Sequence, residues 1–473
     1  MRVAFFVLCG SISLLPAQDI DAALARLVGE PALADARVGV CVRTLEGGTI
    51  VATHDDAKGF MTASNMKLIS SAVALLTLGP DFVFKTELVA RGTVADGVLD
   101  GDLVLVGSGD PTLGGRHEPD GPTAPFDRFA RALRETHGIH TVTGAVLGDD
   151  DCHADEVMGA GWSWAYEGED YAAQVSGLCF AENFVRLQFP ATAAGRTPGL
   201  RVVPETAYLT FDVDVRADGK TTGLDVRRVR AGNKVRVRGT LAADKPASAT
   251  VTMDNPTAFA ATVLRERLLA AGITVRGRAA DLDTVTSPLR PERVVLATHA
   301  SPPLREILVT LNKVSQNLYA EQLPRAAARA AGLVGDMASA EAHAKEVLRG
   351  LGVDVSGMEI ADGSGLTRLN LVQPRQLVAL LLGMHRHAQR DLFISTLPIA
   401  GVDGTLGSRF KEGPAKGTVR AKTGYISRVV CLSGYAGPYA FSVMLNNFTC
   451  STQAAKDAVD AFVTALVATG ANR

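Results

Sequence analysis

The sequence predicts an α+β protein in which an antiparallel sheet flanked by helices is interrupted by β-rich inserted domains. The chain opens with a helix, two strands and a helix, and it closes with three strands and a helix. The interval between these ends is first strand-like and then helical. A chain of 473 residues is too long for one ordinary core, so two or three domains are expected.

The N-terminal elements follow from hydrophobic period and turn signals. Val38, Val40 and Val42 alternate as in a strand, and Gly47-Gly48 is a natural hairpin turn. The next apolar run has the helical period and is stopped by Gly79-Pro80. The predicted elements are a helix at Ile20–Val28, strands at Ala36–Leu45 and Thr49–Thr53, and a helix at Asn65–Leu78.

The middle of the chain is a series of short strand-like runs broken by Gly, Asp and Pro. It extends over roughly two hundred residues, more than one sandwich needs, so one or two inserted domains are expected. The predicted strands are Val98–Val106, Thr141–Leu147, Phe184–Phe189, Leu209–Val215, Val235–Leu241 and Ala249–Met253, with one amphipathic helix at Pro256–Gly272.

The C-terminal part begins as helical and ends as sheet. Gly434 and Gly437-Pro438 mark turns between the last strands. The predicted helices are Leu304–Leu311, Leu318–Ala331, Ala338–Leu351, Gln373–His387 and Gln453–Val467, and the predicted strands are Val419–Ile426, Val429–Tyr435 and Tyr439–Asn446.

Composition excludes several classes of protein. Hydrophobic residues make up 47% and charged residues 21%, as in a packed globular protein. A net charge of −2 and 5% aromatic residues argue against a nucleic-acid partner. Residues 1–17 carry one Arg, an apolar run and a closing Pro16-Ala17, which predicts a secretory signal peptide cleaved after Ala17. The mature protein is expected to be exported, with at most a peripheral membrane association.

Five cysteines follow the predicted signal peptide, an odd number that leaves at least one unpaired. Cys152 and Cys179 fall in the same region and could form a disulfide in an oxidising compartment. Cys41 and Cys431 lie on predicted strands and are more simply buried thiols. The chain has no C-x-x-C or H-E-x-x-H motif, so neither a metal site nor a cofactor is predicted.

Three short motifs together predict a serine acyl-transfer site. Ser64 stands at a helix start with Lys67 one turn later, so the lysine nitrogen can reach the serine hydroxyl. A buried lysine with a lowered pKa can act as the base that activates a serine. Alone, the pair could equally be a helix cap and a solvated lysine, and Ser408 with Lys411 repeats the spacing in a Gly-rich loop.

The second and third motifs supply the other groups that acyl transfer needs. Ser315, between two predicted helices, can relay a proton, and Asn317 can hold the substrate backbone or Lys67. Lys422 and Thr423 on a strand suit a substrate carboxylate. Their neighbours Gly424 and Tyr425 allow close approach of a ligand and offer an amide that pairs with that of Ser64 as an oxyanion hole.

The motifs S-x-x-K, S-x-N and K-T-G, in this order, are the signature of class A β-lactamases and penicillin-binding proteins. The chain resembles more specifically the D-alanyl-D-alanine carboxypeptidase/endopeptidase family, the class C low-molecular-mass penicillin-binding proteins. The further matching segments are Gly107–Leu113, Trp162–Trp164, Asp362–Leu366 with Arg368 and Asn370, and Gly401–Leu406.

The resemblance implies a β-lactamase/transpeptidase-like domain with a second inserted domain nested in the first. The implied boundaries are 18–82 with 290–473 for the catalytic domain, 83–185 with 250–289 for the first insertion, and 186–249 for the nested one. It also implies that Ser64 is acylated, Lys67 is its base and Ser315 the proton relay. Asn317, Lys422 and Thr423 would contact substrate, and Asp149 and Arg368 match positions that bind the peptide side chain in some members.

The predicted function is therefore an exported serine D,D-peptidase acting on D-Ala-containing peptidoglycan peptides, with β-lactams as covalent inhibitors. Thr62, Tyr425 and Ser427 depart from the family pattern and put side-chain specificity in doubt. Two alternatives stay open: a serine β-lactamase-like hydrolase, although no E-x-x-L-N follows the second motif, and a non-catalytic cell-wall-binding protein on the same fold.

Overall fold

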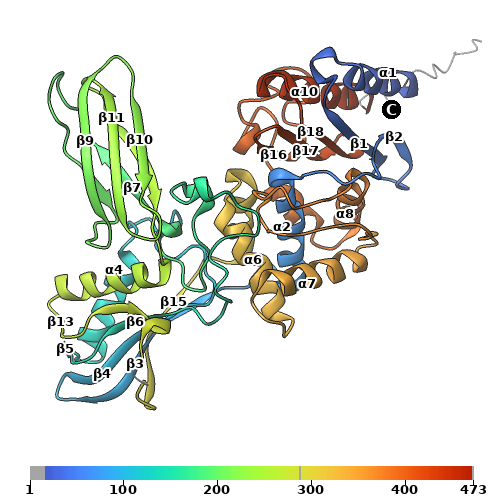
Figure 1. Ribbon diagram of the computed structural model, residues 1–473. Helices are drawn as coiled ribbons and strands as arrows, with labels where there is room; N and C mark the ends of the chain where they lie inside the picture. Colours follow the sequence, from blue (N-terminus) through green and yellow to red (C-terminus); the bar gives the residue numbers. More distant parts are fainter. Residues whose placement is uncertain (1–15, 287–288, 471–473) are drawn as a thin grey trace, which may run out of the picture.

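The computed structural model describes residues 16–286 and 289–470. The predicted signal peptide lies outside these residues for its first fifteen positions. Within the described part of the chain, no helix combines the length and the apolar character needed to cross a membrane. Two regions are apparent in Figure 1: a sheet-and-helix body that contains both ends of the described chain, and a β-rich part that projects from it.

The body is built on a five-stranded antiparallel sheet in the order β16-β17-β18-β1-β2. The chain ends thus meet in one sheet, because β1 pairs with β18 over its whole length. The strands are β1 (Arg37–Thr44), β2 (Ile50–His54), β16 (Arg420–Ile426), β17 (Val429–Ala436) and β18 (Tyr439–Asn446). Predicted and observed strands agree here, because successive buried side chains point alternately to the two faces of the sheet.

Helices cover both faces of this sheet. Val430 and Leu432 on β17 face the core under α1 and α10, whereas Val429 and Cys431 face the core under α2 and α8. The helices of the body are α1 (Pro16–Val28), α2 (Met66–Leu78), α5 (Leu304–Val309), α6 (Asn317–Ala330), α7 (Met337–Gly350), α8 (Pro374–Arg386), α9 (Arg390–Thr396) and α10 (Thr452–Gly470).

The projecting part holds three further sheets. Seven strands form one sheet in the order β13-β5-β4-β3-β15, with β6 joined to β4 and β14; the other two are β10-β11-β9 and β12-β7-β8. Their bounds are β3 (Lys85–Ala95), β4 (Val98–Val106), β5 (Thr141–Val142), β6 (Val146–Asp149), β7 (Phe184–Phe189), β8 (Arg201–Val203), β9 (Thr210–Gly219), β10 (Gly223–Arg228), β11 (Lys234–Ala242), β12 (Ala247–Thr252), β13 (Thr274–Val275), β14 (Ala279–Asp281) and β15 (Arg293–Ala300). Helices α3 (Ala124–Arg131) and α4 (Pro256–Ala270) pack in this part.

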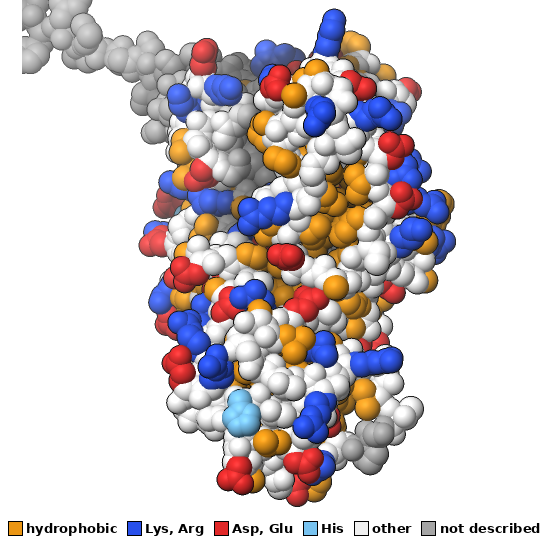
Figure 2. All heavy atoms as spheres, turned by 90° about the vertical axis from the view of Figure 1, so that its left-hand side faces the viewer, with side chains coloured by type: hydrophobic (Ala, Val, Ile, Leu, Met, Phe, Trp, Pro, Cys, Tyr) orange, Lys and Arg blue, Asp and Glu red, His pale blue; other side chains and the backbone are white. Residues whose placement is uncertain are grey.

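Several strands here were not predicted. β3 carries charged and small residues that hide its alternation, yet it pairs with both β4 and β15. β15 extends the inserted sheet past the predicted boundary at residue 290, as far as Ala300. The division into two inserted domains stays a prediction. On the face formed by this part, basic and acidic side chains are interspersed (Figure 2), as expected for a chain with a net charge of −2.

The cysteine prediction is partly wrong. Cys152 and Cys179 are both free thiols, and no disulfide joins them. Cys152 Sγ lies 3.4 Å from the Gly177 carbonyl oxygen, and Cys179 Sγ lies 3.2 Å from that of Ser176, so each thiol donates to nearby backbone instead. Cys41 and Cys431 are fully buried in the sheet, as predicted.

Candidate active site

Ser64 and Lys67 lie at the entry to α2. Ser64 is the middle residue of a single 3₁₀ turn, Ala63–Asn65, and the α-helix begins at Met66. Ala63 has a φ of +43°, a left-handed conformation that is costly for a residue with a side chain. One turn into the helix, Lys67 is fully buried and its Nζ lies 2.9 Å from Ser64 Oγ. The predicted serine–lysine contact is therefore present.

Three oxygens surround the Lys67 amine. Besides Ser64 Oγ, Nζ lies 2.6 Å from Asn317 Oδ1 and 2.7 Å from the Ser364 carbonyl oxygen. The amide and carbonyl oxygens can only accept, so they take two N–H bonds of the amine. In a neutral amine the remaining lone pair then points to the serine hydroxyl.

Burial favours the neutral amine. It lowers the pKa of Lys67 to about 7, against the opposing charges of Asp362 and Glu321, which raise it. A lysine in this state can take a proton from a serine at neutral pH.

Ser315 is held beside the second lysine. The chain makes a π-helical turn at Thr310–Val314, and Ser315 follows in the left-handed conformation with a φ of +67°. Lys422 Nζ donates to Ser315 Oγ at 2.8 Å. Asn317 begins α6, and its Nδ2 donates to the Tyr171 carbonyl oxygen at 2.6 Å. The inserted part of the chain thus contributes backbone to the edge of the site.

The Lys422-Thr423-Gly424 segment lies on β16, directly against the Ser64 turn. Asn65 Nδ2 donates to the Lys422 carbonyl oxygen at 2.9 Å, which ties strand and turn together. A Cβ added to Gly424 would lie 2.7 Å from the Thr62 carbonyl oxygen, so only glycine allows this approach. Thr423 Oγ1 donates to Thr405 Oγ1 at 2.7 Å.

Lys422 is fully buried, like Lys67. Burial, and secondly the positive charge of Lys67, lower the pKa of Lys422 well below its usual value. Two amines in one buried site thus each disfavour protonation of the other. An anionic group that enters this site would meet two side chains able to gain positive charge.

The two positions assigned by resemblance alone lie differently. Arg368 is exposed near the site, and its Nη2 donates to the Ser427 carbonyl oxygen at 2.6 Å, just after the third motif. Asp149 ends β6 in the inserted sheet, where its Oδ1 accepts from the Asp151 N–H at 3.2 Å. Among the described residues no hydrogen bond or ion pair joins Asp149 to the serine–lysine group.

The competing serine is not placed for the same chemistry. Ser408 lies in turn structure, Lys411 is exposed, and no hydrogen bond links the two within the described ranges. Tyr425 is 53% exposed and directly follows the buried Gly424 on β16. Three contributors were missed from sequence: the Ser364 carbonyl, the Thr405 hydroxyl and the Tyr171 carbonyl. The Asp362–Leu366 motif contributes to the family resemblance, but nothing in its sequence indicates that a main-chain oxygen binds Lys67.

Comparisons with known proteins identify the family of this chain. The model of the D-Ala-D-Ala carboxypeptidase 3 (S13) family matches residues 20–468. The chain is similar to the D-alanyl-D-alanine carboxypeptidase of Actinomadura sp. (strain R39), with 34% identity over 91% of this chain and 80% of that protein. It is also similar to D-alanyl-D-alanine carboxypeptidase DacB of Haemophilus influenzae, with 28% identity over 84% of this chain and 82% of that protein.

Solved structures give the same result. The crystal structure of penicillin binding protein 4 (dacB) from Haemophilus influenzae superposes with a TM-score of 0.78 and 25% identity, over 94% of this chain and 98% of that one. Its complex with a novel β-lactam has a TM-score of 0.73 and 24% identity, over 96% and 98% of the chains. The chain therefore belongs to the D-Ala-D-Ala carboxypeptidase 3 (S13) family and is a serine-type D-Ala-D-Ala carboxypeptidase acting on peptidoglycan.

Proposed function

We propose that Ser64 carries the acyl group and that Lys67 is the base that activates it. The contacts of the lysine amine support these roles: two oxygens hold its hydrogens, and its third neighbour is the serine hydroxyl. The neutral amine takes the hydroxyl proton while Oγ attacks the carbonyl carbon of the penultimate D-Ala. The C–N bond to the last D-Ala then breaks, and an ester to Ser64 remains.

The other site residues divide the remaining tasks. Lys422 and Thr423 bind the terminal carboxylate, whose negative charge restores a proton on the buried Lys422 amine. Ser315, hydrogen-bonded to Lys422, relays to the leaving nitrogen the proton that Lys67 took from Ser64, so that Lys67 is neutral again. The amides of Ser64 and Tyr425 stabilise the oxyanion of each tetrahedral intermediate. Water then attacks the ester, with Lys67 again as base, and frees the shortened peptide.

Substrate recognition beyond the scissile bond is assigned to Asn317, Gly424 and Arg368. Asn317 lies beside the Lys67 amine at the start of α6, with its Nδ2 donating to the Tyr171 carbonyl oxygen, and Gly424 lets the peptide backbone approach β16. The exposed Arg368 guanidinium suits an anionic group on the substrate side chain. Asp149 remains a candidate only by resemblance, since it contacts its own turn in this structure.

Intact mass after exposure to a fluorescent penicillin tests the acyl-serine assignment. The wild type should gain one adduct on Ser64, as the Haemophilus influenzae relative is known to bind a β-lactam in the solved complex. Ser64→Ala should gain none, and Ser408→Ala serves as the matched control. An adduct on any other residue contradicts the proposal. Digestion of purified muropeptides, with products read by mass, then separates removal of terminal D-Ala from cleavage of cross-links.

The two alternatives have their own outcomes in the same experiment. A β-lactamase-like hydrolase would release hydrolysed penicillin rapidly, whereas we expect an adduct that persists for minutes or longer. A non-catalytic cell-wall-binding protein would bind muropeptides equally well with Ser64→Ala and would cleave none. The buried amine beside the serine favours the enzyme, since a buried lysine is costly to a protein that makes no use of it.

We infer further that residues 1–17 direct export, because the substrate lies outside the cytoplasm. N-terminal sequencing of the protein recovered from an exporting host tests this inference. A start at Gln18 is expected, and retention of Met1 contradicts it.

A further inference from the structure

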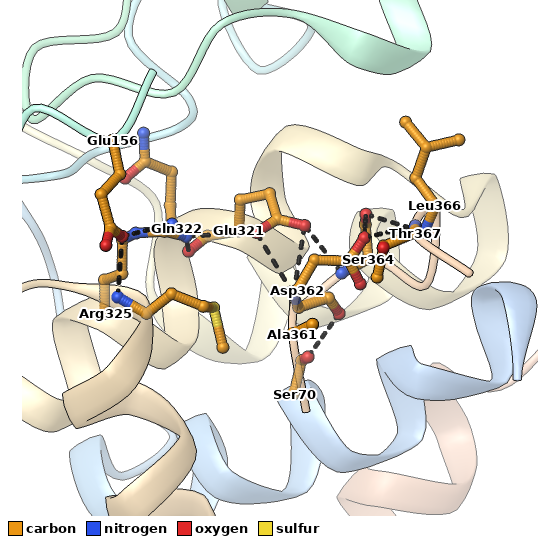
Figure 3. Close-up of polar contacts among 12 residues, drawn as sticks. Ser70, Glu156, Glu321, Gln322, Arg325, Ala361, Asp362, Ser364, Leu366 and Thr367 are labelled. Atoms are coloured by element: carbon orange, nitrogen blue, oxygen red, sulfur yellow. Dashed lines mark hydrogen bonds and ion pairs between the residues drawn. The ribbon is translucent and has the colours of Figure 1, made fainter. Parts of the chain in front are cut away.

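A buried carboxylate outside the three motifs faces the Lys67 site from behind. Glu321 lies on α6 one helical turn after Asn317, so both side chains project from one face of the helix. Asn317 contacts the Lys67 amine directly, whereas Glu321 points to the loop that follows Ala361 (Figure 3). Its side chain is fully buried. A buried carboxylate is expensive unless every oxygen is hydrogen-bonded, so its partners indicate its purpose.

Those partners are the peptide N–H groups of one loop. Glu321 Oε1 accepts from the Ser364 N–H at 2.8 Å and the Gly363 N–H at 3.1 Å. The Ser364 carbonyl, in the same residue, accepts from Lys67 Nζ at 2.7 Å. One residue therefore connects the carboxylate to the catalytic amine.

The loop is also fixed against both helices and the Ser64 turn. A Cβ on Gly363 would lie 2.0 Å from the Ala320 carbonyl oxygen, and one on Gly365 would lie 1.8 Å from that of Ala63. Ser70 Oγ on α2 donates to the Gly363 carbonyl oxygen at 2.6 Å. Displacement of the loop would therefore move the acceptor of Lys67 and the backbone that supports Ser64 together.

Burial and the neighbouring Asp362 raise the pKa of Glu321, and the donors around its carboxylate oppose that rise. Every polar contact of its carboxylate comes from a donor: the two loop amides and Arg325 Nη1, which lies 3.1 Å from Oε2. Arg325 is itself buried and reaches Glu156 Oε2 at 3.3 Å with its other nitrogen (Figure 3). A row of alternating charges thus runs from the inserted part of the chain to the loop behind Lys67.

We propose that Glu321 is a positioning residue for the reaction: it holds the Ser364 carbonyl against the Lys67 amine, and its negative charge sets how readily that amine is protonated. The proposal rests on the proposed function, in which neutral Lys67 activates Ser64. The charged groups that face Lys67 are Asp362 from the loop, Glu321 from α6 and Lys422 from β16.

The sign of the effect follows from these charges. Glu321 and Asp362 both raise the pKa of Lys67, against the larger effect of burial. Removal of the Glu321 charge therefore lowers the pKa of Lys67 and moves the acid limb of acylation to lower pH. One residue, Ser364, bridges the Glu321 carboxylate and the Lys67 amine, and Arg325 partly neutralises the carboxylate. At this separation, removal of the Glu321 charge is expected to shift the acid limb by about half a pH unit or more.

The experiment measures the second-order rate of acylation by a fluorescent penicillin from pH 5 to pH 9. Glu321→Gln keeps the shape of the side chain and removes its charge. Its acid limb should move down by about half a pH unit, and its plateau rate should fall on the order of tenfold because the loop is held less well. Asp460→Asn, which removes the ion pair between Asp460 on α10 and Arg409, is the control and should leave the acid limb in place.

A Glu321→Gln protein that folds and titrates like the wild type overturns the proposal, as does an acid limb that moves upward. If Glu321→Gln does not fold because Arg325 is left unpaired, the double variant Glu321→Gln/Arg325→Gln removes both charges, and a smaller downward shift is expected because loss of the Arg325 charge acts in the opposite direction. Lys67→Ala separates the two levels. Normal acylation by Lys67→Ala refutes the proposed function itself, whereas its loss, together with an unchanged Glu321→Gln profile, refutes only the role of Glu321.

Discussion

The protonation state of Lys67 gives the sharpest prediction, because the proposed mechanism makes this one buried amine the base for acylation. The pKa of Lys67 is lowered by burial to about 7. The neutral form is the active base, so its fraction is about nine tenths at pH 8 and about one tenth at pH 6. Acylation should therefore slow about tenfold between these pH values, and the slope on the acid side should approach one decade per pH unit.

Stopped-flow or quenched measurements of the fluorescent penicillin adduct under pseudo-first-order conditions give this rate directly. Lys67→Arg is the informative variant, since a guanidinium stays protonated and offers no base. Its acylation rate should fall by a factor of about 10²–10⁴ at every pH. A wild-type rate that is flat from pH 5 to pH 9, or a Lys67→Arg protein that is acylated normally, would refute the assignment of Lys67 as base.

The same lysine makes the stability of the fold depend on pH. The folded-state pKa lies below the usual 10.5, so the unfolded chain binds the proton more tightly. Stability should thus rise with pH between about 7 and 10.5 through this group, and this group should leave stability unchanged with pH below about 7, where both states are protonated. Lys422 adds to the trend in the same direction, since burial also lowers its pKa.

Three further predictions follow from particular contacts. Ser408→Ala should be acylated within about twofold of the wild-type rate, because a substitution in an exposed turn is usually neutral. A large loss of acylation in the penicillin assay would contradict the choice of Ser64. Gly365→Ala should lower the free energy of unfolding by about 2 kcal/mol or more, because the Gly365 φ of +82° and the Ala63 carbonyl oxygen exclude a Cβ. Urea titration measures this loss, and an unchanged midpoint would refute the packing. Dithiothreitol should leave the melting temperature unchanged, because the five cysteines of the described chain are free thiols, and a drop of several degrees would reveal a disulfide.

Much of the catalytic body could be predicted from sequence. The closing strands β17 and β18 are buried along their whole length and separated by one glycine turn, so their pattern is plain. The helix after Ser64 likewise has a clear period and a Gly-Pro stop. The inserted part was harder, because strands such as β3 are half exposed and carry charged residues at intervals that blur the alternation.

The absence of a disulfide between Cys152 and Cys179 shows why proximity in sequence is weak support for such a bond. A disulfide depends on the directions of the two Cβ–Sγ bonds, which the sequence spacing does not fix. Both thiols instead turn toward backbone carbonyls. Asp149 is a similar case, since a residue that matches a family position is held here by the turn that follows it.

The order of residues is enough to specify which functional groups this protein has and where they occur: a serine one turn before a lysine, a serine–asparagine pair, and a lysine on a strand near the C-terminus. Those features are local, because spacing on a helix or strand fixes which neighbours share a face. Only the tertiary structure decided what surrounds the Lys67 amine. Its partners come from positions 64, 317 and 364, and one of them is a backbone oxygen that any residue could supply. Burial of that amine, and hence its neutral state, arises only when segments distant in the chain exclude water from it together.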